Sequence, residues 1–160
     1  MLFKKKVAVD KYCRQNLATL FSTDREATWE ALRCACDDGP LNQADAQLYY
    51  RHLRAVFIQL MLIAVAKNSS MDASSHAHIF VMLYLKERGE SAVDEISRDY
   101  NQAFASSCTD GVAEMAQRFG DWVAAGRLNQ KTIEQLQAEF YTILRLFFDD
   151  FKSIKLVAST

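Results

Sequence analysis

Residues 42–68 read NQADAQLYYRHLRAVFIQLMLIAVAKN, and this stretch decides the fold. It contains no glycine or proline, and its apolar residues recur at gaps of three and four, which places them on one face of an α-helix. Between Val56 and Ala66 only Gln59 interrupts the apolar run, so we expect other helices to enclose this half. The residues of the apolar face are Tyr49, Leu53, Val56, Phe57, Leu60 and Ala64.

The size and composition of the chain favour a single helical domain. Its 160 residues are half hydrophobic and 24% charged, as in an ordinary globular protein. One proline and five glycines supply little material for the tight turns that many short strands need. We therefore predict one all-α domain over residues 1–160, in which residues 1–9 form an N-terminal arm. Leu2, Phe3, Val7 and Val9 are expected to dock this arm.

Start and stop signals divide the rest of the chain into helices. Thr23 and Glu26 match a capping box, in which each side chain bonds a backbone N–H of the first turn. Gly39-Pro40 ends the helix that follows, since glycine suits the cap and proline cannot continue the helix. The pattern predicts a bundle of six to seven helices around two long ones, at about 42–68 and 130–154. The shorter helices are expected at about 10–21, 23–39 and 72–88, from 91 onward, and from 109 to 126.

Two details of the shorter helices concern how they pack. In the helix at 72–88 we expect five apolar residues to pack in the core. Gly120 lies inside the helix that begins near residue 109, where glycine costs about 1 kcal/mol relative to alanine. A close crossing of another helix would explain this glycine, and the alternative is that it occurs there by chance. The five residues expected in the core are Ile79, Val81, Met82, Leu83 and Leu85.

An internal pseudo-repeat is a further hypothesis. Residues 23–24 and 109–110 are both Thr-Asp, and residues 41–43 and 128–130 are both Leu-Asn-Gln. The apolar positions that follow stay in step in the two long helices. The alternative is that few residue types cap helices and that every amphipathic helix spaces its apolar residues alike, so the matches need no common origin. If the repeat is real, the two long helices are equivalent neighbours near the centre.

The cysteines and the N-terminal residues bear on the cell compartment. Cys13, Cys34, Cys36 and Cys108 show no zinc-ligand or redox spacing, so we expect reduced core thiols and no metal site. The basic start MLFKKK is followed by a segment too short and too polar for a signal peptide. The apolar run of the long helix is also shorter than the ~20 residues that a bilayer requires. We expect a cytoplasmic protein without a membrane span.

The densest group of aromatic and basic residues lies in the first half of the long helix. It offers His52 as an axial haem ligand or general base, with Arg51 and Arg54 to bind an anion. The alternative is a solvated flank with snorkelling arginines. A pattern Glu-x-x-His, which helical di-iron proteins need twice, does not occur here. The candidate contact residues of this group are Tyr49, Tyr50, Arg51, His52 and Arg54.

Three further side chains are candidates for contact with a ligand or partner. His76 and His78 resemble a metal-binding pair, but side chains two residues apart on a helix diverge by about 200°. Two surface histidines are therefore the alternative. Phe148 lies beside Asp149 and Asp150, where it is either a docking anchor or a core residue.

Net charge and missing motifs narrow the function classes. A formal net charge of −1 argues against broad capture of nucleic acid. No nucleotide-binding, zinc-protease or hydrolase motif occurs, so we expect no cofactor and a non-catalytic interaction or adaptor protein, which binds a protein partner or itself. The alternative is a helical domain that holds an apolar small molecule or haem, with His52 or His76 as polar contact. A weaker alternative is an enzyme that uses Asp45, Arg51 and His52.

Overall fold

The computed structural model describes residues 6–22, 43–124, 134, 137–138, 141–142, 144–146, 149 and 154–157. The helix expected at 23–39 and residues 1–5 of the arm lie outside this part of the chain. The prediction of an all-α bundle is confirmed, with one small sheet added. Every described position from 134 to 149 is helical, in agreement with the second long helix. The elements are β1 (Lys6–Ala8), α1 (Val9–Ser22), α3 (Gln43–Asn68), α4 (Met71–Glu87), α5 (Ser91–Ser106), α6 (Gly111–Ala124) and β2 (Lys155–Val157).

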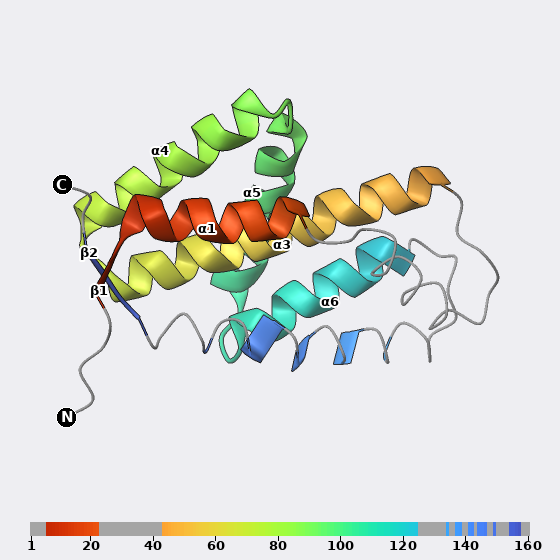
Figure 1. The fold of residues 1–160 in the computed structure, drawn as a ribbon. Helices are drawn as coiled ribbons and strands as arrows, with labels where there is room; N and C mark the ends of the chain where they lie inside the picture. Colours follow the sequence, from red (N-terminus) through yellow and green to blue (C-terminus); the bar gives the residue numbers. More distant parts are fainter. Residues whose placement is uncertain are drawn as a thin grey trace.

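Helix α3 lies at the centre of the fold. From Ala55 to Val65 every side chain is buried except that of Phe57, which is partly buried. Helices α1, α4, α5 and α6 all contact α3, and Figure 1 shows it running along the middle of the molecule. The enclosure follows from the sequence, because a helix that is apolar on every side must be covered on every side.

Helix α4 covers α3 with one face and leaves its other face exposed. Its buried residues are spaced by four, so they form a single stripe along the helix that packs against α1, α3 and α5. The prediction that Ile79, Met82 and Leu83 pack in the core is wrong, since these side chains are 56%, 50% and 49% exposed. The apolar residues of α4 lie on several sides of the helix, but the rest of the bundle packs against one side only. The buried stripe is Ala73, Ala77, Val81 and Leu85.

Polar residues and a glycine set the ends of α4. The Ser70 side chain accepts a hydrogen bond from the Ala73 N–H at 3.3 Å, which satisfies one free donor of the first turn. After the last turn Gly89 adopts a φ of 68°, a left-handed conformation that favours glycine. The Glu90 N–H then donates to the Leu85 carbonyl at 2.9 Å, and the chain turns into α5.

The two strands form a parallel pair in which Val7 is aligned with Leu156. They join segments from the two ends of the sequence, and Figure 1 shows them beside the start of α1. The expected docking of the arm is confirmed at Val9, which is fully buried, and at Val7, which packs against the core. The sheet itself was not expected, because three-residue strands are too short to show alternating hydrophobicity.

Asp110 joins α6 to the helical segment at 134–149. Its Oδ1 accepts hydrogen bonds from the N–H groups of Val112 at 3.0 Å and Ala113 at 3.3 Å, so Asp110 caps α6. Its Oδ2 accepts the hydroxyl hydrogen of Tyr141 at 2.7 Å, and Arg145 lies 3.8 Å from Oδ1. One carboxylate therefore begins a helix and holds a second helical segment against it.

Gly120 allows the helical segment at 134–149 to approach α6 closely. A Cβ atom at Gly120 would collide with the side chain of Gln137, whose Nε2 donates to the Gln117 carbonyl at 3.0 Å. The same Nε2 lies 3.0 Å from Asp121 Oδ1. The close approach that would explain this glycine is therefore present. The equivalence of the two long helices, which the pseudo-repeat requires, stays a prediction.

Replacing Ala77 by leucine tests whether the inner face of α4 is tightly packed. Ala77 is fully buried, so the added atoms have no space and we expect the free energy of unfolding to fall by about 1–3 kcal/mol. Urea denaturation followed by circular dichroism measures this loss. The same change at Ala105, which is exposed on α5, is the control and should have little effect. Equal effects at the two positions would contradict the packing described for α4.

Replacing Asp110 by alanine tests the cap of α6. Burial raises the pKa of Asp110, but hydrogen bonds from Tyr141, Ala113 and Val112, together with Arg145, lower it more, and the net pKa lies below its ordinary value. The stability that this carboxylate contributes is therefore present above the ordinary pKa and is lost as pH falls through the lowered one. We expect the variant to lose about 1–2 kcal/mol near pH 7 and less in acid. A difference from wild type that does not change between neutral and acid pH in urea denaturation would contradict this account.

Candidate functional site

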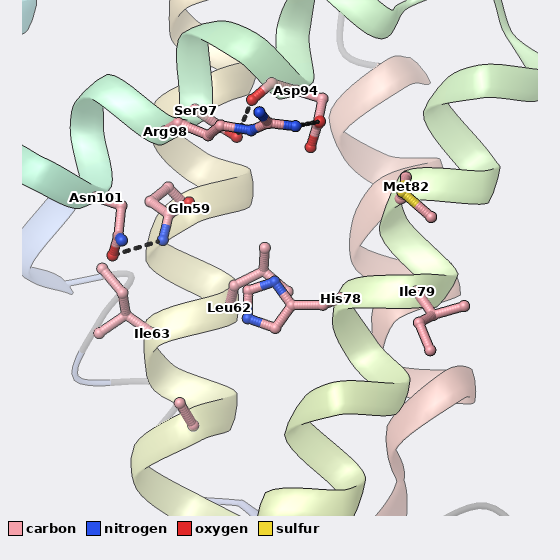
Figure 2. Close-up of a pocket in the computed structure, with 11 residues that line it drawn as sticks. Gln59, Leu62, Ile63, His78, Ile79, Met82, Asp94, Ser97, Arg98 and Asn101 are labelled. Carbon is pink, nitrogen blue, oxygen red and sulfur yellow. Dashed lines mark hydrogen bonds and ion pairs between the residues drawn. The ribbon is translucent and has the colours of Figure 1, made fainter.

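A groove with a volume of about 400 Å³ opens between α3, α4 and α5. Leu62 and Ile63 of α3 form its floor, and Figure 2 shows His78 of α4 pointing across it toward Leu62. Ile79 and Met82 stand on the α4 side, where both side chains are about half exposed. The α3 and α4 sides of the groove are therefore mainly apolar.

Helix α5 supplies a polar wall to the same groove. Arg98 Nη2 lies 2.9 Å from Asp94 Oδ2, one helical turn away, and this pair leaves the wall with charges of both signs. Asn101 accepts a hydrogen bond from Gln59 Nε2 at 3.1 Å, and the Ser97 hydroxyl donates to the Asp94 carbonyl at 2.8 Å. Figure 2 shows these contacts along one side of the groove. The groove is thus amphipathic, with its polar groups on one helix.

Sequence reasoning missed this polar wall. Asp94, Ser97, Arg98 and Asn101 are spaced by three and four, so they share one face of a helix. That spacing is a signal in the sequence, and Gln59, the one break in the apolar run of α3, is a second. The sequence does not show that Gln59 lies beside the polar face of α5, because that depends on how α3 and α5 pack.

His52, the candidate haem ligand or base, is buried between α3, α5 and α6. Its Nδ1 lies 2.8 Å from the Tyr100 hydroxyl, and its ring stacks on that of Trp122 with an angle of 17° between the planes. Burial lowers the pKa of His52 to about 4, so the imidazole is neutral near pH 7. Burial also raises the pKa of Tyr100. These contacts make His52 part of the packing between helices.

The two arginines of the same segment differ in their surroundings. Arg51 is exposed, as the alternative of a solvated flank predicts, but Arg54 is only 4% exposed and contradicts it. Arg54 Nη1 lies 3.2 Å from Glu90 Oε1, and its guanidinium carbon lies 4.4 Å from the centre of the Phe21 ring. Arg54 is buried because α1 and the start of α5 cover this side of α3.

The remaining candidates are dispersed. Tyr50 packs against the core, and His76 and His78 are both exposed on α4, where only His78 lines the groove. The side chains of Tyr49 and Phe148 lie outside the described residues. The structure therefore does not bring all the predicted contact residues together in one site.

The cysteines within the described part of the chain are free thiols in different surroundings. Cys13 is buried, and burial with the nearby charge of Asp10 raises its pKa to about 12, so it is a core thiol as predicted. The prediction of a core thiol is wrong for Cys108, which is exposed in the turn between α5 and α6. Cys34 and Cys36 lie outside the described residues. Among the residues that the structure describes, no three histidine, cysteine or acidic side chains are grouped as metal ligands would be.

Comparisons with known proteins gave no match among family models, curated proteins or solved structures. Within the described helices, none is long and apolar enough to cross a membrane.

Replacing His52 by asparagine tests whether its burial makes the protein sensitive to acid. The folded pKa lies below the ordinary value of 6.5, so the unfolded chain binds the proton more readily and wild-type stability falls as pH drops from about 6.5 to about 4. The asparagine variant lacks this titration. It should be the less stable protein near pH 7.5 because it loses the contact with Trp122.

Urea denaturation at about pH 7.5 and about pH 4.5 measures the free energy of unfolding of both proteins. The difference between wild type and variant should shrink by about 2–3 kcal/mol at the lower pH. A difference that stays constant would contradict a buried neutral imidazole at this position.

Proposed function

We propose that this protein is a non-catalytic interaction module that binds an amphipathic helix of a protein partner. The binding surface is the outer face of α4, defined by Met71, Ile79, Met82 and Leu83, together with the adjoining groove. Single exposed apolar residues are common on protein surfaces. Here Ile79, Met82 and Leu83 stand together on one helix, and the first two line the groove. This observation carries the proposal.

The chemistry of the surface indicates what kind of partner fits it. An apolar side formed by α4 and the floor of the groove faces a polar wall with Asp94 and Arg98. A helix with one apolar face would bury that face against Ile79 and Met82. Its polar edge would then meet the carboxylate, guanidinium and amide groups of α5. This arrangement is one of the recurring modes in which proteins bind peptides.

The small-molecule alternative draws support from the volume of the groove. About 400 Å³ falls within the range of ligand pockets, and Leu62 and Ile63 offer an apolar floor. The version with haem on His52 has less support, because Trp122 and Tyr100 contact the imidazole. The enzyme alternative on Arg51 and His52 is weakened by the same burial of His52.

The proposal also includes a cytoplasmic location. Cys108 is an exposed free thiol. A reducing compartment keeps such a thiol free.

A photo-crosslinking amino acid placed at position 82 tests the proposed surface in living cells. We expect a product of defined mass from position 82 but not from position 146, where Leu146 is 64% exposed outside α4 and serves as matched control. The crosslinked segment is then identified and made as a peptide. It should bind the purified protein, and Met82→Glu should weaken that binding by about tenfold or more, since a carboxylate replaces an apolar contact. Equal products from both positions, or peptide binding insensitive to Met82→Glu, would contradict the proposal.

A further inference from the structure

We infer that the helix bound on the outer face of α4 is α4 of a second copy of this chain, packed antiparallel to the first. This inference rests on the proposed function and names its partner. It concerns the outer face only, since the inner stripe of α4 is buried in its own bundle.

The outer side of α4 carries the spacing of a helix that pairs with another helix. Five residues from Asp72 to Lys86 follow one another at steps of three, four, three and four, and all five are exposed. This alternation keeps side chains on one seam between two helices. Ile79 and Met82 occupy its centre, and Leu83 flanks them. The seam residues are Asp72, Ser75, Ile79, Met82 and Lys86.

The charges at the two ends of the seam select the antiparallel orientation. Asp72 lies in the first turn of α4 and Lys86 in the last. In a parallel pair each of these side chains would face its own copy, and like charges would meet at both ends. In an antiparallel pair Asp72 of each copy meets Lys86 of the other, so two opposite-charge contacts form. The two helix dipoles also point in opposite directions, which is favourable. Exposed ion pairs are weak, so they determine orientation more than affinity.

The sizes of the side chains are complementary as well. A two-fold axis through Ile79 places Ser75 opposite Leu83 of the second copy, so a small residue receives a large one. The same axis places Asp72 opposite Lys86. A symmetric dimer needs a surface that complements itself in this way, and this self-complementarity argues for a second copy as occupant.

The length of α4 predicts a weak dimer. Its 17 residues extend about 26 Å, and one pair of such helices buries less than the roughly 1,600 Å² of a standard interface. We therefore expect a dissociation constant on the order of 10–100 µM.

Sedimentation equilibrium of the purified full chain from about 5 to about 500 µM tests the inference, because this range brackets the expected constant. Wild type should dimerise reversibly. Ile79→Glu places two carboxylates at the axis and should raise the dissociation constant about tenfold or more. Leu146→Glu makes the same kind of change at an exposed residue outside α4 and should leave it unchanged. Circular dichroism confirms that each variant is folded, as expected for exposed positions.

Charge exchange tests the orientation. Asp72→Lys and Lys86→Asp should each weaken the dimer, because each places like charges opposite one another. An equimolar mixture of the two variants should restore dimerisation, since both ends then carry opposite charges. In a parallel pair neither single change would introduce a new repulsion, so an unchanged dissociation constant in both would overturn the antiparallel arrangement.

A monomer at every concentration, or a dimer that Ile79→Glu does not weaken, would overturn the second-copy inference. The proposed function would still stand if the crosslink from position 82 reached a different protein whose peptide binds and is sensitive to Met82→Glu. If the peptide does not bind as expected and the protein does not dimerise, both the proposed function and the second-copy inference are wrong.

Discussion

Except at Gln59, helix α3 is apolar around its circumference from Ala55 to Val65, and the rest of the described structure depends on burying it. Each apolar side chain withdrawn from water stabilises the fold by roughly 25 cal/mol per Å² of buried surface. No single neighbour can cover all sides of a helix, so α1, α4, α5 and α6 each contribute a face. Among the described helices, the packing of these four against α3 follows from this requirement.

The polar groups of α3 determine how its neighbours are placed. His52 and Gln59 are buried, and both find their partners on α5, at Tyr100 and Asn101. Leaving either side chain without a partner would cost about 1–3 kcal/mol, so these contacts favour one alignment of α5 along α3. That alignment also brings the polar face of α5 beside the floor of the groove. Helix α4 then lies at the edge of the bundle with an apolar side facing outward, and the candidate site is a consequence of how α3 is enclosed.

The sequence was sufficient for the central helix and insufficient for the site. Spacing and the absence of glycine and proline predicted α3 because these signals act within one segment. Spacing cannot say from which direction a helix is covered, so Ile79 was expected inside and is exposed. The alternative that placed Arg54 in solvent fails for the same reason, because Glu90 and Phe21, both distant in sequence, contact it. The strands are three residues long, and such short segments carry no periodic signal.

Native-state hydrogen exchange tests most directly whether α3 is the centre of the fold. Amides from residues 56 to 65 should exchange only when the whole protein unfolds, with the same free energy and the same dependence on urea as global unfolding. Amides of α4, which is covered on one face, should exchange at equal or lower free energy. Exchange of the α3 amides at a lower free energy than those of α4 would contradict the account.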